Sequence, residues 1–414
     1  MEYPEVEALL TPESLRLLDE TQAPTSKDDV LATVSRLRKA SHPLERVHAV
    51  MNQLSLRAKA REKFGDFASR MLFTKEGLEQ ATRLDVASHH AGRFRDAGIT
   101  SLIDAGCGIG ADSLAFSGLG IHVTAIERDT ATAALASYNL APFPETTVIN
   151  ADVLDVDISG AKALWIDPAR REGATRLHNP EDWSPSLDWV FEMATKLPTG
   201  IKLAPGMDRE LIPQGVEAQW VSHHGSVVEM VLWSGALKRE GITRSALVIS
   251  RSGTAEMVAG ADSPDAEVGD LQEYLYEPDG AIIRARLIGD LARSVDATMI
   301  DASIAYFSAS AAHHSPLMQG FQIIEHVPYT PKNVSALVGG ANLGNLEIKK
   351  RGIDIDPSEL RKTLPLSGSG SATLILTRVN GKKTALLAKR LGLVGEDVAG
   401  ADEEREDNGQ GYED

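Results

Sequence analysis

Cysteine is almost absent from the sequence, since Cys107 is the only one in 414 residues. A single cysteine excludes an internal disulfide and any metal site built from cysteine ligands. No apolar run approaches the roughly 20 residues that a membrane-spanning helix needs. The first ten residues, MEYPEVEALL, are acidic and lack the basic start and apolar core of a signal peptide. These absences predict a cytoplasmic protein without a membrane anchor.

Positive charge is scarce overall but concentrated in one region. The formal net charge of −17 argues against a protein coated in nucleic acid. Residues 330–390, however, contain eleven Lys and Arg residues and only four acidic residues. Residues 391–414 then hold nine acids and one arginine. The sequence therefore predicts a basic module followed by an acidic tail, although an ordinary solvated surface beside a disordered end explains the same pattern.

The hydrophobic periodicity changes along the chain and indicates several domains, as a length of 414 residues suggests. The first part is helical in pattern, with Pro and Ser/Thr at APTS and SHP as helix stops and caps. Short apolar runs then alternate with helical segments, which is typical of a parallel sheet covered by helices on both faces. The expected segments are a helical domain (1–75), the parallel α/β domain (76–237), a mixed α/β connecting region (238–330), a small basic α+β module (331–392) and a disordered acidic tail (393–414).

Two turns are visible in the strand pattern. The stretch EAQWVSHHGSVVEMVLWSG predicts two strands around His224-Gly225, at an antiparallel edge of the sheet. Asn380-Gly381 predicts a tight hairpin turn in the basic module, because both positions of such a turn require positive φ.

A glycine-rich loop follows the first predicted strand of the α/β domain, in LIDAGCGIGADSLAF. Gly106, Gly108 and Gly110 let the backbone turn tightly and approach a ligand, and the helix that follows offers free N–H groups. The loop alone is ambiguous, because Gly106, Gly108 and Ala111 also satisfy the dinucleotide pattern G-x-G-x-x-G/A. A purely structural turn is a further alternative.

Acidic residues end the next three predicted strands. Glu127 lies about twenty residues after the glycines, where a carboxylate can accept both hydroxyls of a ribose. Asp152 ends the third strand, within reach of an exocyclic adenine amine, and Asp167-Pro168 ends the fourth. Any one of these acids alone is most simply an ordinary loop residue. Together with the glycine loop they predict a nucleoside-containing cofactor at the carboxyl edge of the sheet.

With these residues in place, the chain resembles the class I S-adenosylmethionine-dependent methyltransferases. It is similar in particular to a bacterial family of RNA methyltransferases that end in a THUMP-like domain. The matching strings are EQAT, DPARR, YEPDGAIIRA and LEIKKRGIDIDP, within roughly residues 57 to 391. The resemblance implies a Rossmann-like sheet, S-adenosyl-L-methionine as cofactor, and a cofactor site made of Thr82, Asp104, Gly106, Gly108, Gly110, Glu127 and Asp152.

The same resemblance makes ALWIDPARR an active-site loop. Amino-group methyltransferases often carry Asp/Asn-Pro-Pro-aromatic here, where the Asp and a prolyl carbonyl orient the target amine. Asp167 and Pro168 fit that pattern as catalytic residues, but Ala169 replaces the second proline and Arg170 the aromatic. Arg170 can stack on a base or bind phosphate, as can Arg171, or it can pair with an acid inside the protein.

The basic module supplies the other candidate substrate contacts, Lys349, Lys350 and Arg351, with Lys382 and Lys383 past the hairpin turn. The adjacent pairs His223-His224 and His313-His314 point to opposite faces if they lie in strands, so we expect packing rather than metal binding. No metal site is predicted.

The leading hypothesis is therefore a methyltransferase that modifies a base nitrogen in RNA, either in a tRNA or in an rRNA. The altered loop leaves open a catalytically silent, cofactor-dependent RNA-binding protein. The net charge leaves open a small-molecule methyltransferase. A dinucleotide oxidoreductase is disfavoured by Asp152 and the Asp167-Pro168 loop.

Overall fold

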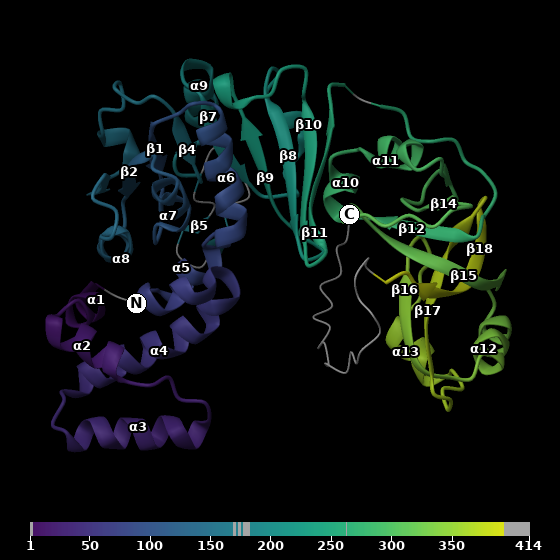
Figure 1. Cartoon of the computed structure of the whole chain (residues 1–414), viewed down its shortest axis with the longest axis horizontal. Coiled ribbons are helices and arrows are strands. Elements are labelled where there is room, and N and C mark those ends of the chain that lie inside the picture. Colours follow the sequence, from purple (N-terminus) through teal and green to yellow (C-terminus); the bar gives the residue numbers. More distant parts are fainter. Residues whose placement is uncertain (1–2, 169–170, 173–174, 177–182, 262, 393–414) are drawn as a thin grey trace. The chain divides into compact units, whose positions relative to one another are not determined.

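The structure is a computed structural model that describes residues 3–168, 171–172, 175–176, 183–261 and 263–392. The chain divides into two compact units, and Figure 1 colours them along the sequence. The first unit comprises Met1–Ile249, Glu256–Asp262 and Gly280–Leu287, and the second comprises Ser250–Ala255, Ser263–Asp279 and Ile288–Asp414. Within the described ranges, no helix is long and apolar enough to cross a membrane.

Helices occupy the first seventy residues, as the periodicity predicts. They begin at capping residues: the Thr11 hydroxyl accepts from the Ser14 N–H at 3.3 Å, and the Ser26 hydroxyl from the Asp29 N–H at 3.2 Å. Leu54 shares one hydrophobic cluster with Leu135 of α8 (Thr130–Leu140), so these helices pack on the sheet domain. The elements are α1 (Tyr3–Leu9), α2 (Pro12–Glu20), α3 (Lys27–Lys39), α4 (Leu44–Phe64) and the 3₁₀ turn η1 (Gly65–Arg70).

The described residues of the next segment form a nine-stranded sheet in the order β11-β10-β8-β9-β7-β4-β1-β2-β3. Strands β3, β2, β1, β4 and β7 run parallel, whereas β9 is antiparallel to its neighbours β7 and β8. The strands are β1 (Ser101–Ala105), β2 (His122–Glu127), β3 (Thr146–Asn150), β4 (Leu164–Ile166), β7 (Thr199–Leu203), β8 (Glu217–His223), β9 (Ser226–Trp233), β10 (Arg244–Ser250) and β11 (Gly253–Ala259). This is the α/β sheet that the alternating pattern predicts.

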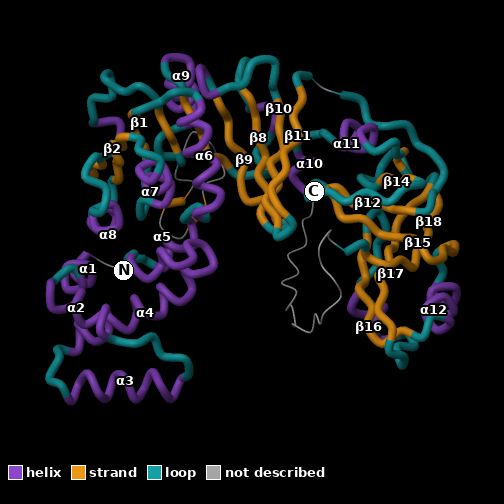
Figure 2. Tube along the Cα trace, in the orientation of Figure 1, coloured by secondary structure: helices purple, strands orange, loops and turns teal. Residues whose placement is uncertain are grey.

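Helices accompany these strands in the chain order that the pattern predicts (Figure 2). They are α5 (Lys75–Gln80), α6 (Leu84–Asp96), α7 (Ala111–Gly118), α8 (Thr130–Leu140), α9 (Leu187–Lys196) and α10 (Gly280–Arg284). Short elements complete the unit: 3₁₀ turns η2 (Val153–Asp155), η4 (Arg209–Leu211) and η5 (Gly235–Leu237), and the pair β5 (Arg171–Glu172) and β6 (Thr175–Arg176).

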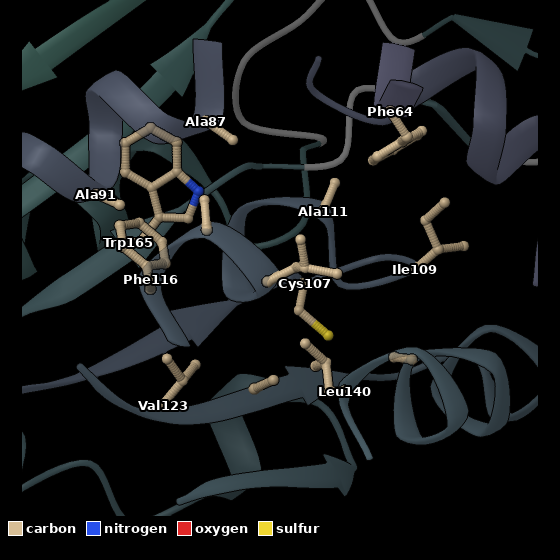
Figure 3. Close-up of a cluster of buried hydrophobic side chains, with 14 of the residues drawn as sticks. Phe64, Ala87, Ala91, Cys107, Ile109, Ala111, Phe116, Val123, Leu140 and Trp165 are labelled. Carbon is tan, nitrogen blue, oxygen red and sulfur yellow. The ribbon is translucent and has the colours of Figure 1, made fainter. Parts of the chain in front are cut away.

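An aromatic core lies behind the carboxyl ends of β1 and β4. Trp165 and Phe116 are fully buried with ring centroids 5.8 Å apart, and Ala87 and Ala91 of α6 belong to the same cluster (Figure 3). Small residues on α6 let this helix approach the sheet closely, while the large rings fill the space between them. This packing fixes α6 against β4; α6 carries His90 of the site described below, and Asp167 directly follows β4.

The second unit is built on a seven-stranded sheet of described residues, in the order β13-β14-β12-β15-β18-β17-β16. Its strands are β12 (Tyr274–Pro278), β13 (Thr298–Met299), β14 (Phe307–Ala309), β15 (Met318–Pro328), β16 (Leu343–Lys350), β17 (Gly370–Val379) and β18 (Lys382–Arg390). Its helices are α11 (Ile288–Ser294), α12 (Pro331–Gly340) and α13 (Pro357–Lys362). The hairpin turn at Asn380-Gly381 is confirmed, since both residues have positive φ and β17 pairs antiparallel with β18.

One expectation about the first sheet is wrong. β8 and β9 do pair antiparallel around His224-Gly225, but they do not form an edge of the sheet. Strand β10 pairs in parallel with β8, and β11 lies beyond it in the strand order. The expected connecting region, 238–330, is thereby divided: β10 extends the first sheet, whereas β12 to β15 belong to the second. The physical reason is that β8 is buried along its whole length, so its outer edge needs a hydrogen-bonding partner.

Candidate active site

A cleft of about 680 Å³ opens at the carboxyl ends of β1, β2, β4 and β7 in the first unit. Its size lies within the range of about 300–1,000 Å³ that is typical of small-molecule sites. Its position is where open α/β sheets bind ligands. Of the residues predicted from the sequence, the cleft gathers Thr82, Asp104, Gly106, Gly108, Glu127, Asp152, Asp167 and Pro168.

The glycine loop forms one wall of this cleft. Gly106 has φ +85°, and a Cβ there would lie 3.1 Å from the carbonyl oxygen of Asp167. Glycine therefore lets the loop after β1 approach the loop after β4. At Gly108, a Cβ would have no heavy atom of the described chain within 4 Å, so this backbone borders open space. The loop thus presents bare backbone to the cleft, where the sequence predicts a ligand.

Gly110 has a different position from the other two glycines. It caps α7 in the left-handed conformation, and a Cβ there would lie 3.0 Å from the Leu140 side chain. Gly110 is not among the residues that line the cleft. The structure therefore gives Gly110 a packing role, although the sequence groups it with the cofactor ligands.

Glu127 joins the end of β2 to the glycine loop. Its Oε2 accepts from the Gly108 N–H at 3.0 Å, and its Oε1 accepts from the Asp129 N–H at 2.8 Å. Each carboxylate oxygen has two lone pairs, so both keep one acceptor position. Burial raises the pKa of Glu127 above its ordinary value, against the two N–H groups that favour the charged form. At the end of the next strand, Asp152 caps η2 by accepting from the Leu154 N–H at 3.0 Å.

Asp104 is buried at the base of the cleft. Burial raises its pKa to about 8, the nearby Asp112 adds to the rise, and the Ser113 hydroxyl donates to its Oδ2 at 2.6 Å. At neutral pH this carboxyl is therefore mostly protonated. Because Ser113 lies in α7, the bond also ties the first turn of that helix to β1.

Four charged residues that the sequence analysis did not single out complete the site: His90, Asp112, Lys202 and Glu229. The Thr82 hydroxyl donates to Asp112 Oδ2 at 2.7 Å and accepts from Lys202 Nζ at 3.0 Å. Thr82 is thus engaged within the protein and positions these two charges. One signal was available, since Lys202 interrupts the apolar strand GIKLAPG.

His90 bridges two buried carboxylates. Its Nδ1 lies 2.8 Å from Asp112 Oδ1 and its Nε2 lies 2.6 Å from Glu229 Oε1, and the side chain is only 2% exposed. Burial by itself lowers the pKa of His90, but Glu229 and Asp112 raise it to about 9. The ring also packs on Trp165, with centroids 4.4 Å apart. At neutral pH His90 is therefore an imidazolium that donates both N–H groups.

Asp167 ends β4 and forms an ion pair with Lys202 on β7, at 2.6 Å between Oδ2 and Nζ. Burial raises the pKa of Asp167 above its ordinary value, and Lys202 opposes this rise. Burial alone would lower the pKa of Lys202, but Asp167, Asp112 and Glu229 raise it, so the ammonium stays charged. The predicted catalytic aspartate is thus already paired with a cation.

The structure describes only the backbone of one of the two loop arginines. Arg170 lies outside the described residues. Arg171 begins β5, where its backbone pairs with Arg176, and its side chain is not described. Their predicted contacts with substrate remain predictions.

The predicted substrate contacts of the basic module lie in the second unit, where they differ in their exposure and in their ion pairs. Lys349 Nζ lies 2.7 Å from Glu277 Oε2, and Arg351 lies 3.6 Å from the same carboxylate. Lys350 is exposed. Two of the three predicted contacts are therefore already partnered within their own unit.

Comparisons with known proteins identify the family of the chain. A family described as THUMP domain-like matches residues 318–390, and a domain of unknown function matches residues 3–60. An uncharacterized S-adenosylmethionine-dependent methyltransferase of Mycobacterium tuberculosis is 31% identical over 333 residues, which cover 78% of this chain and 90% of that protein. The chain belongs to the S-adenosylmethionine-dependent methyltransferases. A crystal structure assigned to a methyltransferase from Porphyromonas gingivalis superposes with a TM-score of 0.71 at 20% identity, covering 89% of this chain and 100% of its own.

The cofactor of this methyltransferase is S-adenosyl-L-methionine, and the cleft fits it. The bare backbone at Gly108 borders the open space, and Glu127 keeps an acceptor position on each carboxylate oxygen. Acidic side chains along the cleft suit a ligand that carries a positive sulfonium. When bound, the cofactor supplies an activated methyl group, so the protein's task is to position an acceptor and exclude water. Among the described residues, no group of three or more His, Cys, Asp or Glu side chains could hold a metal ion.

We predict that Glu127→Ala weakens S-adenosylmethionine binding by about 1.5–3 kcal/mol, as expected for hydrogen bonds to a charged group. The variant loses the two carboxylate oxygens that are predicted to accept the ribose hydroxyls, and it also releases the Gly108 N–H. Calorimetric titration measures the change. Glu145→Ala is the control, because Glu145 is an exposed acid whose side chain is 69% accessible. Equal affinities of Glu127→Ala and the unaltered protein would remove Glu127 from the cofactor site.

Proposed function

We propose that this methyltransferase acts on RNA. Support comes chiefly from the second unit, which matches a THUMP domain-like family and carries eleven basic residues against four acids between residues 330 and 390. RNA affinity depends largely on contacts between Lys or Arg and phosphates. A net charge of −17 for the chain does not prevent such contacts, because the positive charge is gathered in one module.

We further propose the roles of the cleft residues. Glu127, Asp152, Gly106 and Gly108 hold the cofactor, while Asp104 and Thr82 support that site from buried positions. Asp167 and Pro168 face the acceptor. The helical segment and the small basic module serve as accessory domains, and the protein works in the cytoplasm.

The strand register indicates which basic residues of the second sheet lie on the same face. Lys350 pairs with Leu376, and Lys383 pairs with Arg378, two residues further along β17. Because side chains alternate along a strand, Lys350, Arg378 and Lys383 share one face near one end of the sheet. Lys349 lies on the other face, where Glu277 partners it. Lys350 and Lys383 are exposed, so we assign them to the RNA-binding surface.

We predict that replacing Lys350 and Lys383 together with alanine weakens RNA binding and flattens its salt dependence. Each lost phosphate contact changes the slope of log affinity against log salt by roughly 0.7 on single strands. Fluorescence titration from low to moderate salt measures that slope. The control replaces Lys162 and Lys196, two exposed lysines of the first unit. Superimposable lines for both double variants and the unaltered protein would exclude this surface.

A chain that ends at residue 392 provides a second arm of the same titration. Residues 391–414 hold nine acids and one arginine, which compete with RNA for a basic surface. We expect the shortened chain to bind RNA more tightly at low salt, and we expect the difference in affinity between the two chains to vanish as salt screens the charges.

A methyl-transfer assay tests the proposed activity on RNA. An RNA methyltransferase transfers labelled methyl from the cofactor to total RNA, whereas a silent RNA-binding protein transfers none.

A further inference from the structure

Lys202 is placed in the cleft in a way that bears on the atom that receives the methyl group. Its side chain is 13% exposed, and its Nζ lies 2.6 Å from Asp167 Oδ2 and 3.0 Å from the Thr82 hydroxyl. An ammonium has three N–H donors, and the described chain occupies two of them. The third remains for a group in the cleft, which Lys202 lines together with Asp167.

Lys63 lines the same cleft but is engaged differently. Its Nζ donates to the carbonyl oxygens of Leu78, Glu79 and Ala81, each at 2.8 Å, and so uses all three donors. Lys63 therefore secures the carboxyl end of α5. Of these two lysines, only Lys202 keeps a donor for a ligand.

A nitrogen atom as the acceptor of the methyl group does not suit the free N–H donor of Lys202. A neutral amine that accepts a methyl group gains positive charge, and it needs acceptors for its N–H groups rather than another donor. An unpaired ammonium about 4 Å away, at an effective dielectric constant of about 20, would slow such a step by about 10³-fold, and the Asp167 carboxylate reduces this factor. Because Lys202 holds Asp167 Oδ2, only the rest of that carboxylate is left to accept from an amine N–H group.

A hydroxyl acceptor uses both members of the pair. As its oxygen attacks, it must lose a proton and passes through a state with partial negative charge. Asp167 can take the proton, and the Lys202 ammonium can stabilise the charge on oxygen. Burial raises the pKa of Asp167, which makes this carboxylate a stronger base than an exposed one.

We infer that the methyl acceptor is a hydroxyl oxygen, held by the third N–H of Lys202 and deprotonated by Asp167. The acceptor oxygen forms a bond to the methyl carbon, the carbon–sulfur bond breaks with its electron pair staying on sulfur, and the hydroxyl proton passes to Asp167. This inference rests on the proposed action on RNA, whose internal hydroxyls are the ribose 2′-OH groups. The product is therefore a 2′-O-methylated nucleotide, in place of the methylated base nitrogen expected from the Asp-Pro motif alone.

Product analysis with the full chain tests this inference. The protein is incubated with methyl-labelled S-adenosylmethionine and total RNA from cells that lack its gene, and the RNA is then hydrolysed with alkali. A 2′-O-methyl group blocks cleavage at its own phosphodiester, so we expect the label in alkali-resistant dinucleotides. Label in mononucleotides, on a base, overturns the hydroxyl acceptor and leaves the proposed RNA substrate standing. Absence of label from RNA overturns both.

Variants of Lys202 give a second test. We expect Lys202→Met to lower single-turnover methyl transfer by about 10²–10³-fold, and Lys202→Arg to recover part of the rate. Lys196→Met is the control, because Lys196 is an exposed lysine of α9 that pairs with the exposed Glu192. Loss of the cation disfavours the Asp167 carboxylate, so the acid limb of the residual pH profile moves to higher pH. A Lys202→Met variant that transfers methyl at the normal rate or faster overturns the inference, and the product analysis decides it if that variant does not fold.

Discussion

Replacing Asp167 with asparagine is expected to lower the rate of methyl transfer by about 10²–10⁴-fold, the usual contribution of a general base. The change removes the proton acceptor but keeps the shape of the side chain, and the amide oxygen can still accept from Lys202. Asparagine is preferable to alanine here, because alanine would leave a buried ammonium without its partner.

Cofactor affinity is expected to stay within a few-fold in the same variant. The proposed cofactor contacts lie after β1, β2 and β3, whereas Asp167 follows β4. Single-turnover rates and calorimetry separate the two effects. Asp157→Asn is a matched control, since Asp157 is an exposed loop acid that does not line the cleft and accepts from the Ser159 N–H at 2.9 Å. If Asp167→Asn turned over at the normal rate, Asp167-Pro168 would be a structural turn and not a catalytic loop.

The largest loss of stability is expected from His90→Ala, at about 3–5 kcal/mol in the free energy of unfolding. Removing the imidazolium leaves the buried carboxylates of Asp112 and Glu229 without their shared partner. It also removes a ring that packs on Trp165. Urea unfolding at neutral pH measures the loss. His89→Ala is the control, because His89 is the adjacent but exposed histidine and a surface change there is expected to stay within about 0.5 kcal/mol.

The pH dependence of that difference has a definite sign. The pKa of His90 is raised from 6.5 in the unfolded chain to about 9 in the folded protein. Its contribution to stability is therefore fully present below pH 6.5 and is lost as the pH rises through about 9. The difference in the free energy of unfolding between the unaltered protein and His90→Ala should therefore become smaller as the pH rises from 6.5 to about 9. A constant gap from pH 6.5 to 9.5 would mean that His90 does not carry a proton in the folded state.

Much of the proposed cofactor site is determined by sequence that is local in the chain. The glycine loop, Glu127 and Asp152 follow successive strands, and parallel strands bring their carboxyl ends to one edge of the sheet. The hairpin at Asn380-Gly381 was likewise predictable, because two adjacent residues set its backbone conformation. In each case the determining interactions span a few residues, or follow from a repeated strand–helix unit.

The charged centre of the site was decided only by the tertiary structure. His90 meets Asp112 across 22 residues and Glu229 across 139, and Lys202 meets Thr82 across 120. A local pattern can mark a single residue such as Lys202, but not its partners, because the packing of α6 against the sheet and the order of β4 and β7 bring them together. The pairing of Lys349 with Glu277, 72 residues away, changed a predicted RNA contact into an internal ion pair for the same reason. Sequence periodicity determines which face of an element is apolar, but only the packed elements determine which buried charges neutralise one another, and here that decides which groups remain free to act on a substrate.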